Sequence, residues 1–381
     1  MLVGVPKEIK VHEYRVGLTP TSVRELVHHG HEVIVEKGAG SEIGLDDERY
    51  GAAGAVLADA AEEVFARADL IVKVKEPQPH ECRVLREGQV LFTYLHLAPN
   101  PEQTRLLMES GCVAIAYETV TDARGRLPLL APMSEVAGRM SIQAGAHCLE
   151  KAQEGRGVLL SGVAGVPAAK VIVLGAGVVG TNAARMAMGL EADVTVIDKS
   201  LARLQELDEL FGSRLNTIYA TVESVEEHVL EADLVVGAVL IPGAEAPKLV
   251  DREMVKRMRR GSVVVDVSID QGGCFETSRP TTHADPAYVL DGVVHYCVTN
   301  MPGAVARTST LALTNATLPF VLALADKGYR VALYEDPHLR AGLNVHHGRV
   351  THRAVARAHN LKYDPAEQEI MPQDSPGSRP G

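Results

Sequence analysis

The 381-residue sequence has only five cysteines, and they do not form a disulfide framework. Their number is odd and no two stand as a C-x-x-C pair, which is typical of reduced cysteines in a cytosolic protein. The sequence also lacks an excess of positive charge, because 38 Lys and Arg oppose 49 Asp and Glu for a net charge of −11. This balance argues against nucleic acid and anionic membranes as partners.

Long hydrophobic runs are missing as well. The most apolar late segment, residues 311–325, is interrupted by polar residues and Pro319, and we expect it to fall short of a membrane-spanning helix. A strand predicted at residues 2–5 begins the chain at once, so we expect no secretory signal and a cytoplasmic protein. A late group of histidines lacks the spacing of metal ligands, so we expect a solvated loop and no metal there: His346, His347 and His352.

What is present is enough apolar sequence, 46%, for two α/β domains. Segments that predict strands alternate with segments that predict helices, which indicates mostly parallel sheets covered on both faces. The predicted strands are residues 2–5, 32–36, 70–74, 90–97, 113–117, 170–174, 194–198, 234–240, 262–267 and 293–298. The predicted helices include residues 20–29, 59–66, 101–109, 133–151 and 308–327, the last bent or broken near Pro319.

This alternation predicts two Rossmann-like, doubly wound parallel-sheet domains separated by a cleft. The first domain, residues 1–130, has no phosphate-binding glycine sequence, and the second domain covers residues 131–305. Too little chain follows for a third domain, so we expect residues 306–370 to return to the first domain. Residues 371–381 are rich in proline and glycine, and we expect this tail to be disordered.

The most specific motif lies within residues 170–198. A strand of mostly β-branched residues leads directly into Gly175, Gly177 and Gly180, spaced G-x-G-x-x-G, and a second strand ends at Asp198. The glycines allow a tight turn, close approach of a pyrophosphate and close packing of the following helix, whose N-terminus favours phosphate. The Asp198 carboxylate is expected to bind ribose hydroxyls and to repel a 2′-phosphate, which favours NAD over NADP. The alternative is a glycine-rich turn without a ligand.

In an open parallel sheet, ligands bind beyond the carboxyl ends of the strands. Three loops of the second domain, residues 240–242, 268–273 and 299–303, are therefore expected around a nicotinamide ring. Asp270 is the acid in a loop relaxed by two glycines, so it could transfer protons. Its alternative role is to cap the backbone of its own loop.

The first domain has unusual residues where its strands end. Lys75 follows an apolar strand, and Tyr94 and His96 point the same way if their strand alternates with period two. Together they could bind an anionic substrate and transfer a proton. The alternatives are that His96 is a core histidine with satisfied hydrogen bonds and that Arg15, after the first strand, is a surface residue.

With these segments assembled, the chain resembles the alanine dehydrogenase family. This family also includes the N-terminal part of nicotinamide nucleotide transhydrogenase. The resemblance spans about residues 1–360. It is carried by VPKEI from Val5, RVGLTP from Arg15, VKVKEP from Val72, YLHL from Tyr94, PMSEVAG from Pro132, GAGVVG from Gly175, DVSIDQGG from Asp266 and NMPG from Asn300.

The resemblance implies a cytoplasmic homohexamer that uses NAD for the reversible oxidative deamination of L-alanine to pyruvate and ammonium. It implies that Arg15 and Lys75 hold the substrate carboxylate and carbonyl oxygen, and that His96 and Asp270 are the acid–base pair. Further substrate contacts that it implies are Tyr94, Met133 and Asn300. The NAD contacts that it implies are Ser134, Gly175, Gly177, Val178, Val179, Gly180, Asp198, Arg203, Ala220, Val239, Leu240, Val267, Ser268, Ile269, Asp270, Arg279, Val298, Thr299, Asn300 and Met301.

Three other functions remain open on the sequence. A transhydrogenase subunit shares the fold but has no alanine site and needs a membrane partner. A non-catalytic NAD-binding regulator needs the glycine loop and Asp198 but not the charges at the strand ends of the first domain. A dehydrogenase for another amino or hydroxy acid fits the same motifs. Lys75, His96 and Asp270 together favour the alanine dehydrogenase.

Overall fold

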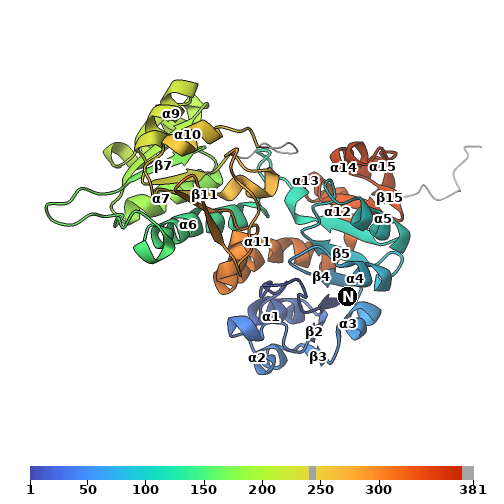
Figure 1. The fold of residues 1–381 in the computed structure, drawn as a ribbon. Coiled ribbons are helices and arrows are strands. Elements are labelled where there is room, and N and C mark those ends of the chain that lie inside the picture. Colours follow the sequence, from blue (N-terminus) through green and yellow to red (C-terminus); the bar gives the residue numbers. More distant parts are fainter. Residues whose placement is uncertain (240–245, 371–381) are drawn as a thin grey trace, which may run out of the picture. The chain divides into compact units, whose positions relative to one another are not determined.

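The structure, a computed structural model, describes residues 1–239 and 246–370 and separates into two compact units (Figure 1). Unit 1 comprises Met1–Pro132 and Ala306–Gly381, and unit 2 comprises Met133–Val305. Each unit has its own sheet of mostly parallel strands flanked by helices, so the predicted α/β class with two such sheets is confirmed. The predicted disordered tail, residues 371–381, lies outside the described residues.

Unit 1 is built on an eight-stranded sheet. Its elements are β1 (Leu2–Val5), α1 (Pro20–His28), β2 (Glu32–Glu36), η1 (Ser41–Ile43), α2 (Asp47–Ala52), β3 (Val56–Ala58), α3 (Ala61–Arg67), β4 (Leu70–Val72), α4 (Pro79–Val84), β5 (Val90–Thr93), α5 (Pro101–Ser110), β6 (Val113–Ala116), η2 (Tyr117–Thr119), α11 (Ala306–Lys327), α12 (Tyr329–Glu335), α13 (Pro337–Arg340), β14 (Leu343–His346), β15 (Arg349–Val350), α14 (Arg353–Ala358) and α15 (Ala366–Ile370). The strand order is β15-β14-β6-β5-β4-β1-β2-β3. Strands β1 to β6 are parallel, and β14 and β15 join antiparallel. The order reverses between β1 and β4, so a ligand site is expected beyond the carboxyl ends of these strands.

Unit 2 is built on a seven-stranded sheet. Its elements are α6 (Ala131–Cys148), η3 (Lys151–Gln153), β7 (Lys170–Leu174), α7 (Val178–Gly189), β8 (Asp193–Asp198), α8 (Leu201–Phe211), η4 (Gly212–Arg214), β9 (Asn216–Tyr219), α9 (Val222–Glu231), β10 (Leu234–Gly237), α10 (Arg252–Arg257), β11 (Val263–Asp266), η5 (Val267–Gln271), β12 (Ala287–Leu290), β13 (Val293–Tyr296) and η6 (Met301–Val305). The strand order is β12-β13-β11-β10-β7-β8-β9, with only β12 antiparallel among the described strands. This is a dinucleotide-binding order, and it reverses between β7 and β10.

The central strand β7 shows why its sequence is apolar without interruption. Val171 and Val173 pack into one core cluster, which includes residues of α6 and α7. Ile172 and Leu174 point to the other face, into a cluster that includes residues of α9 and α10. Both faces of the sheet are therefore covered, and a parallel strand in this position must be apolar at every residue.

Some strands end earlier than predicted, and short edge strands have no counterpart among the predictions. Strands β4, β5 and β10 end at Val72, Thr93 and Gly237, because the apolar sequence continues into loops that leave the sheet. The unpredicted β9 and β12 are four residues long and partly exposed, so they lack the fully apolar signal of central strands.

The helix α11 also differs from its prediction, since it continues through Pro319 from Ala306 to Lys327. Thr317 and Val321, on either side of the proline, are fully buried, and we attribute the continuity to this packing. The prediction that this segment falls short of a membrane span is wrong by length and composition, because Met301–Lys327 satisfies both. In the structure 44% of its most apolar window is buried, and core helices of soluble proteins meet the same criterion.

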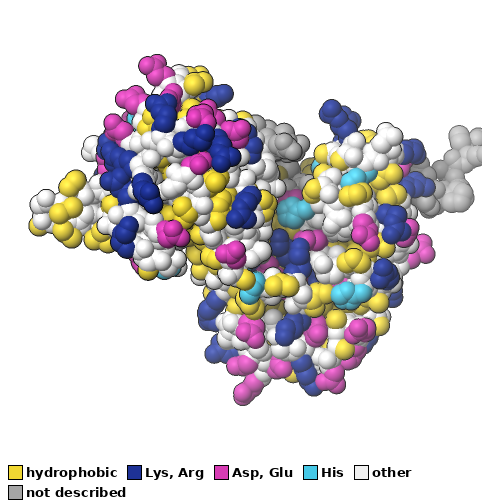
Figure 2. Space-filling view, in the orientation of Figure 1, with side chains coloured by type: hydrophobic (Ala, Val, Ile, Leu, Met, Phe, Trp, Pro, Cys, Tyr) yellow, Lys and Arg dark blue, Asp and Glu magenta, His cyan; other side chains and the backbone are white. Residues whose placement is uncertain are grey.

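Charged side chains of both signs are interspersed on the visible faces of both units (Figure 2). Several form pairs along a helix, such as Arg67 with Glu63 and Arg105 with Glu109. Exposed pairs of this kind contribute about 1 kcal/mol or less to stability, so the fold depends mainly on its two buried sheets.

Candidate functional site

The glycine loop of unit 2 connects β7 to α7 beside the point where strand order reverses. Gly175 has a φ of +107°, and a Cβ on it would lie 2.7 Å from the carbonyl oxygen of Ala238. A Cβ on Gly180 would lie 1.8 Å from the Gly175 oxygen, so only glycine lets α7 pack this closely. Gly177 is the N-cap of α7, and a Cβ there would meet nothing within 4 Å. This open N-terminus has the geometry that suits a pyrophosphate.

Asp198 ends β8 next to this loop. Its carboxylate accepts hydrogen bonds from the N–H groups of Ala176, at 2.6 Å, and Ser200, at 2.7 Å. Arg203 lies across the same loop and donates from Nη2 to the Ala176 carbonyl at 3.0 Å, while it forms an ion pair with Glu206. The acid is half-buried, and its contacts fix it against the loop that the glycines shape.

Most of the other predicted cofactor contacts follow the remaining strands of the same sheet. Val239 comes after β10, and its carbonyl accepts a hydrogen bond from the Ser268 hydroxyl at 2.7 Å. The helix η5 after β11 holds Val267, Ser268, Ile269 and Asp270, and the segment after β13 holds Val298, Thr299, Asn300 and Met301. Because these strands are parallel, the residues that follow them lie along one edge of the sheet. Leu240, with the rest of the predicted loop at residues 240–242, lies outside the described residues.

The structure also gives a role to Asp266, an acid for which no role was predicted from the sequence. Asp266 is fully buried at the end of β11, and burial raises its pKa. Its carboxylate accepts hydrogen bonds from the N–H groups of Ser268 and Cys274, at 3.1 and 3.0 Å, and from the Ser278 hydroxyl at 2.6 Å. Asp266 therefore anchors this loop. Asp270 itself is exposed.

In unit 1, Arg15 lies in the loop after β1 and is only 2% exposed. It forms a two-point ion pair with Glu13, from Nε to Oε1 at 2.7 Å and from Nη2 to Oε2 at 2.6 Å. Burial opposes the charge, but the hydrogen bonds and charge of Glu13 raise the pKa of Arg15 above its ordinary value. The alternative that Arg15 is a surface residue is wrong.

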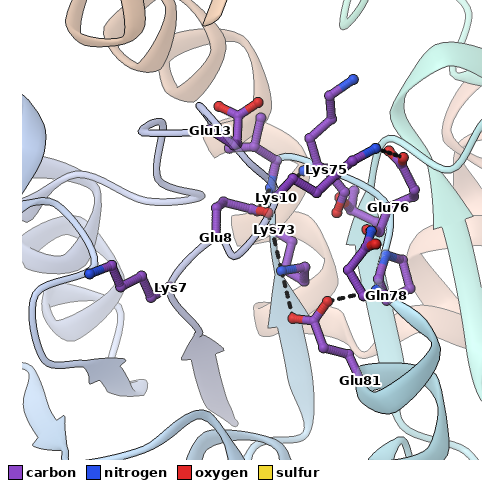
Figure 3. Close-up of polar contacts among 12 residues, drawn as sticks. Lys7, Glu8, Lys10, Glu13, Lys73, Lys75, Glu76, Gln78 and Glu81 are labelled. Carbon is purple, nitrogen blue, oxygen red and sulfur yellow. Dashed lines mark hydrogen bonds and ion pairs between the residues drawn. The ribbon is translucent and has the colours of Figure 1, made fainter. Parts of the chain in front are cut away.

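Two lysines follow β4, and the structure gives them different environments (Figure 3). Lys73 is fully buried and forms ion pairs with Glu8, at 3.2 Å, and Glu81, at 2.9 Å. Lys75 is half-buried, and within residues 1–239 and 246–370 its ammonium group makes no ion pair. Its side chain extends away from Lys73 and the two carboxylates. Lys75 is thus the more accessible of the two lysines.

Tyr94 and His96 lie close together, although the strand from which we expected them to point the same way ends before either residue. Their rings stack at 5.8 Å between centroids, with planes 9° apart. Strand alternation is not the cause, because β5 ends at Thr93 and His96 has a φ of +49°. The Tyr94 hydroxyl donates to the Leu129 carbonyl at 2.5 Å, and burial raises the pKa of Tyr94, so this residue stays protonated.

His96 is held by a carboxylate from the next strand end. Its backbone N–H donates to Glu118 at 2.6 Å, and its Nδ1 lies 4.0 Å from the same oxygen. Because 47% of its side chain is exposed, the alternative that it is a core histidine is wrong. Arg15, Lys75, Tyr94 and His96 therefore follow β1, β4 and β5 at the carboxyl edge of the unit 1 sheet.

The remaining predicted residues belong to unit 2. Met133 is buried and Ser134 half-buried near the start of α6, and Ala220 donates its N–H to the Asp198 carbonyl at 3.0 Å. The Arg279 guanidinium lies 4.0 Å from the centre of the Tyr288 ring. Asn300 has a φ of +63°, and its carbonyl lies 3.1 Å from Nε2 of His283.

The structure corrects the expectation of a solvated loop for one of the three late histidines. His346 is on β14, only 2% exposed, and its Nδ1 lies 3.2 Å from Glu369, so a solvated loop is wrong for this residue. Burial lowers its pKa. Within the part of the chain that the structure describes, no group of three or more His, Cys, Asp and Glu could hold a metal ion.

Comparison with known proteins adds independent findings. The N-terminal domain of alanine dehydrogenase/PNT matches residues 4–137, and the C-terminal domain of the same family matches residues 141–353. The alanine dehydrogenase of Halomonas elongata is 62% identical over 363 residues, which cover 95% of this chain and 98% of that protein. The alanine dehydrogenase of Bacillus subtilis is 54% identical over 376 residues, or 98% and 99% of the two chains.

Solved structures agree with these sequence matches. An L-alanine dehydrogenase superposes with a TM-score of 0.92 at 52% identity, over 94% of this chain and 99% of that one. A transhydrogenase from Sinorhizobium meliloti superposes with a TM-score of 0.80 at 29% identity, over 93% and 100%. The chain belongs to the alanine dehydrogenase/PNT family and is an oxidoreductase with a Rossmann-type nucleotide-binding unit.

Proposed function

We propose that this chain is an NAD-dependent L-alanine dehydrogenase that interconverts L-alanine with pyruvate and ammonium. The observation that carries the proposal is the edge of the unit 1 sheet where Arg15, Lys75, Tyr94 and His96 follow neighbouring strands. A bare dinucleotide-binding regulator has no need for two cations and a histidine in this place. The nearly full-length similarity to proteins named alanine dehydrogenase supports the same substrate.

The substrate carries a carboxylate beside its reacting carbon, and cationic side chains are suited to hold it. We assign Arg15 and Lys75 to the carboxylate and the carbonyl oxygen, since charge-assisted hydrogen bonds are the strong ones. Arg15 is fixed by Glu13, whereas Lys75 presents an ammonium group without an ion pair among the described residues. Tyr94, Met133 and Asn300 are assigned further contacts to the substrate.

Bound NAD supplies the acceptor for the hydride that leaves the α-carbon of L-alanine. The resulting imine must then take up water, which needs a base, and must expel ammonia, which needs an acid. We assign these proton transfers to His96 and Asp270. The Lys75 ammonium stabilises negative charge that develops on oxygen in the hydrated intermediate.

The family implies a nicotinamide dinucleotide, and the residues of unit 2 fit one. The open Gly177 N-cap suits the pyrophosphate, and Asp198 suits the adenosine ribose. We propose NAD rather than NADP because the Asp198 carboxylate would repel the 2′-phosphate of NADP. Ser134, Arg203 and the residues after β10, β11 and β13 complete the proposed cofactor site.

The cofactor assignment predicts the effect of Asp198→Ala. Losing a charge-assisted hydrogen bond should weaken NAD binding by about 1.5–3 kcal/mol and narrow the preference over NADP. Isothermal titration calorimetry with NAD and with NADP measures both affinities. Asp193→Ala, at the exposed start of the same strand, is the matched control and should leave both affinities unchanged. Wild-type protein that binds NADP as well as NAD contradicts the placement of Asp198.

The proposed localisation, assembly and partners rest on the resemblance to the family. We propose a cytoplasmic homohexamer with small-molecule partners, L-alanine, pyruvate and ammonium, and with no nucleic acid or membrane partner. The similarity to a transhydrogenase keeps hydride transfer between two dinucleotides as the second candidate function.

A substrate panel tests the proposal. Purified protein with NAD is offered L-alanine, glycine, L-serine and L-lactate, and NADH is followed by absorbance; L-alanine should give the highest kcat/KM. A higher kcat/KM with a hydroxy acid than with L-alanine would contradict the proposed substrate. Binding of NAD without turnover of any substrate favours the regulator. Reduction of an NADP analogue by NADH alone favours the transhydrogenase.

A further inference from the structure

The backbone of Lys75 is held at both of its polar groups. Oε1 of Glu8 accepts hydrogen bonds from the N–H groups of Val74, at 2.7 Å, and Lys75, at 3.2 Å. The Lys75 carbonyl accepts a hydrogen bond from the Thr93 hydroxyl at 3.0 Å. Beyond the end of β4 at Val72, the Tyr94 N–H donates to the Val74 carbonyl at 3.3 Å, so Glu8 and the segment after β5 hold the backbone next to Lys75 together.

Glu8 is fixed in turn by buried charge. Its second oxygen, Oε2, accepts from the Lys73 ammonium, which also binds Glu81 (Figure 3). The side chains of these three residues are at most 2% exposed. Removing one member of a buried ion pair is costly, so the cluster resists rearrangement. The loop after β1 is thereby joined to the segment that carries Lys75.

We propose that Glu8 is a positioning residue, which sets the ammonium group of Lys75 for the substrate through the backbone of Val74 and Lys75. The inference rests on the proposed role of Lys75 in substrate binding. Glu8 lies behind the lysine and does not itself contact the substrate. A displacement of about 1 Å in a binding group can cost up to about a hundredfold in rate, so the effect should be measurable.

Glu81 provides a matched control inside the same cluster. It binds the same ammonium group, but its other oxygen accepts the N–H of Gln78, at the start of α4, at 2.7 Å. Glutamine at either position removes one negative charge and turns one acceptor into a donor. In Glu8→Gln the donor must face either Lys73 or the two N–H groups that hold Lys75. In Glu81→Gln the same conflict arises away from Lys75.

The experiment measures pyruvate reduction at saturating NADH and ammonium, together with NADH affinity and the thermal midpoint. We expect Glu8→Gln to lower kcat/KM for pyruvate about tenfold to a hundredfold. The NADH affinity of Glu8→Gln should stay within about twofold of that of wild type. The control Glu81→Gln should change the thermal midpoint about as much as Glu8→Gln does, but it should leave kcat/KM for pyruvate within about twofold of wild type. If Glu8→Gln does not fold, Glu8→Asp keeps the charge but shortens its reach to the two N–H groups, and should show the same loss.

A double-mutant cycle with Lys75→Ala decides between positioning and general damage. If Glu8 acts through Lys75, adding Glu8→Gln to Lys75→Ala should cost little more. The proposal is overturned if the loss is undiminished in the Lys75→Ala background, or if Glu81→Gln is as slow as Glu8→Gln. Inactive wild-type protein instead refutes the proposed function, so the two failures are distinct.

Discussion

Replacing Asp270 by asparagine should slow turnover of L-alanine by about 10²–10⁴-fold, with binding of NAD largely retained. Asparagine keeps the size of the side chain but cannot take up or release the proton. The loop should keep its conformation, because the buried Asp266 carboxylate accepts hydrogen bonds from Ser268, Cys274 and Ser278. We therefore expect a stability loss of about 1 kcal/mol or less. Steady-state kinetics, calorimetric titration with NAD and thermal unfolding measure the three quantities.

A control and a second variant sharpen this result. Asp285→Asn makes the same chemical change at an exposed acid of unit 2 and should behave as wild type. His96→Gln should resemble Asp270→Asn, and the two losses should not add fully if both residues serve one proton path. Turnover of Asp270→Asn within a few-fold of wild type removes Asp270 from the mechanism and leaves His96 to act alone.

Replacing Lys75 by alanine should both raise KM for pyruvate and lower kcat. The ammonium group is assigned to the substrate oxygen before reaction and to the negative charge that develops there afterwards. Losing one such donor typically costs about 10²–10³-fold in kcat. Lys7→Ala is the control, because this lysine is exposed in the same unit (Figure 3). A Lys75→Ala enzyme with unchanged kcat would limit the residue to binding, and one with unchanged kcat/KM would exclude it from the site.

The parts of the site that the sequence predicts best are local. The strand, the glycine loop, the helix and Asp198 lie within about thirty residues, and a Cβ on Gly175 or Gly180 would clash with the backbone, as their places in the motif predict. Lys75 and His96 were also predicted from local features, as polar residues that follow apolar strands. A common site for them could be predicted because the carboxyl ends of parallel strands lie at one edge of the sheet, where ligands bind.

The groups that hold these residues could not be predicted in the same way. Glu8 meets Lys73 across 65 positions of sequence, and Glu118 meets His96 across 22. No spacing rule connects such pairs, because the sheet order β6-β5-β4-β1 brings them together. For the same reason Lys73 and Lys75 look equivalent in the sequence, although one is fully buried between two carboxylates.

Edge strands were missed for a different reason. Strand β9 is partly exposed along its length, and β12 joins antiparallel at the border of the sheet. Their side chains need not be apolar at every position, so the pattern that marks β7 or β10 is absent. Strand ends were overestimated where buried loop residues, such as Val74 and Leu95, continue the apolar sequence beyond the ladder.

The most direct measurement of the central claim follows the hydrogen on the α-carbon. Purified protein is incubated with NAD and L-alanine deuterated at C2, and the reduced cofactor is examined by mass spectrometry and NMR. The proposed reaction predicts one deuterium on the nicotinamide ring of the NADH and pyruvate without deuterium from C2. Reduced cofactor without deuterium, or no reduced cofactor while NAD is bound, would contradict hydride transfer from L-alanine.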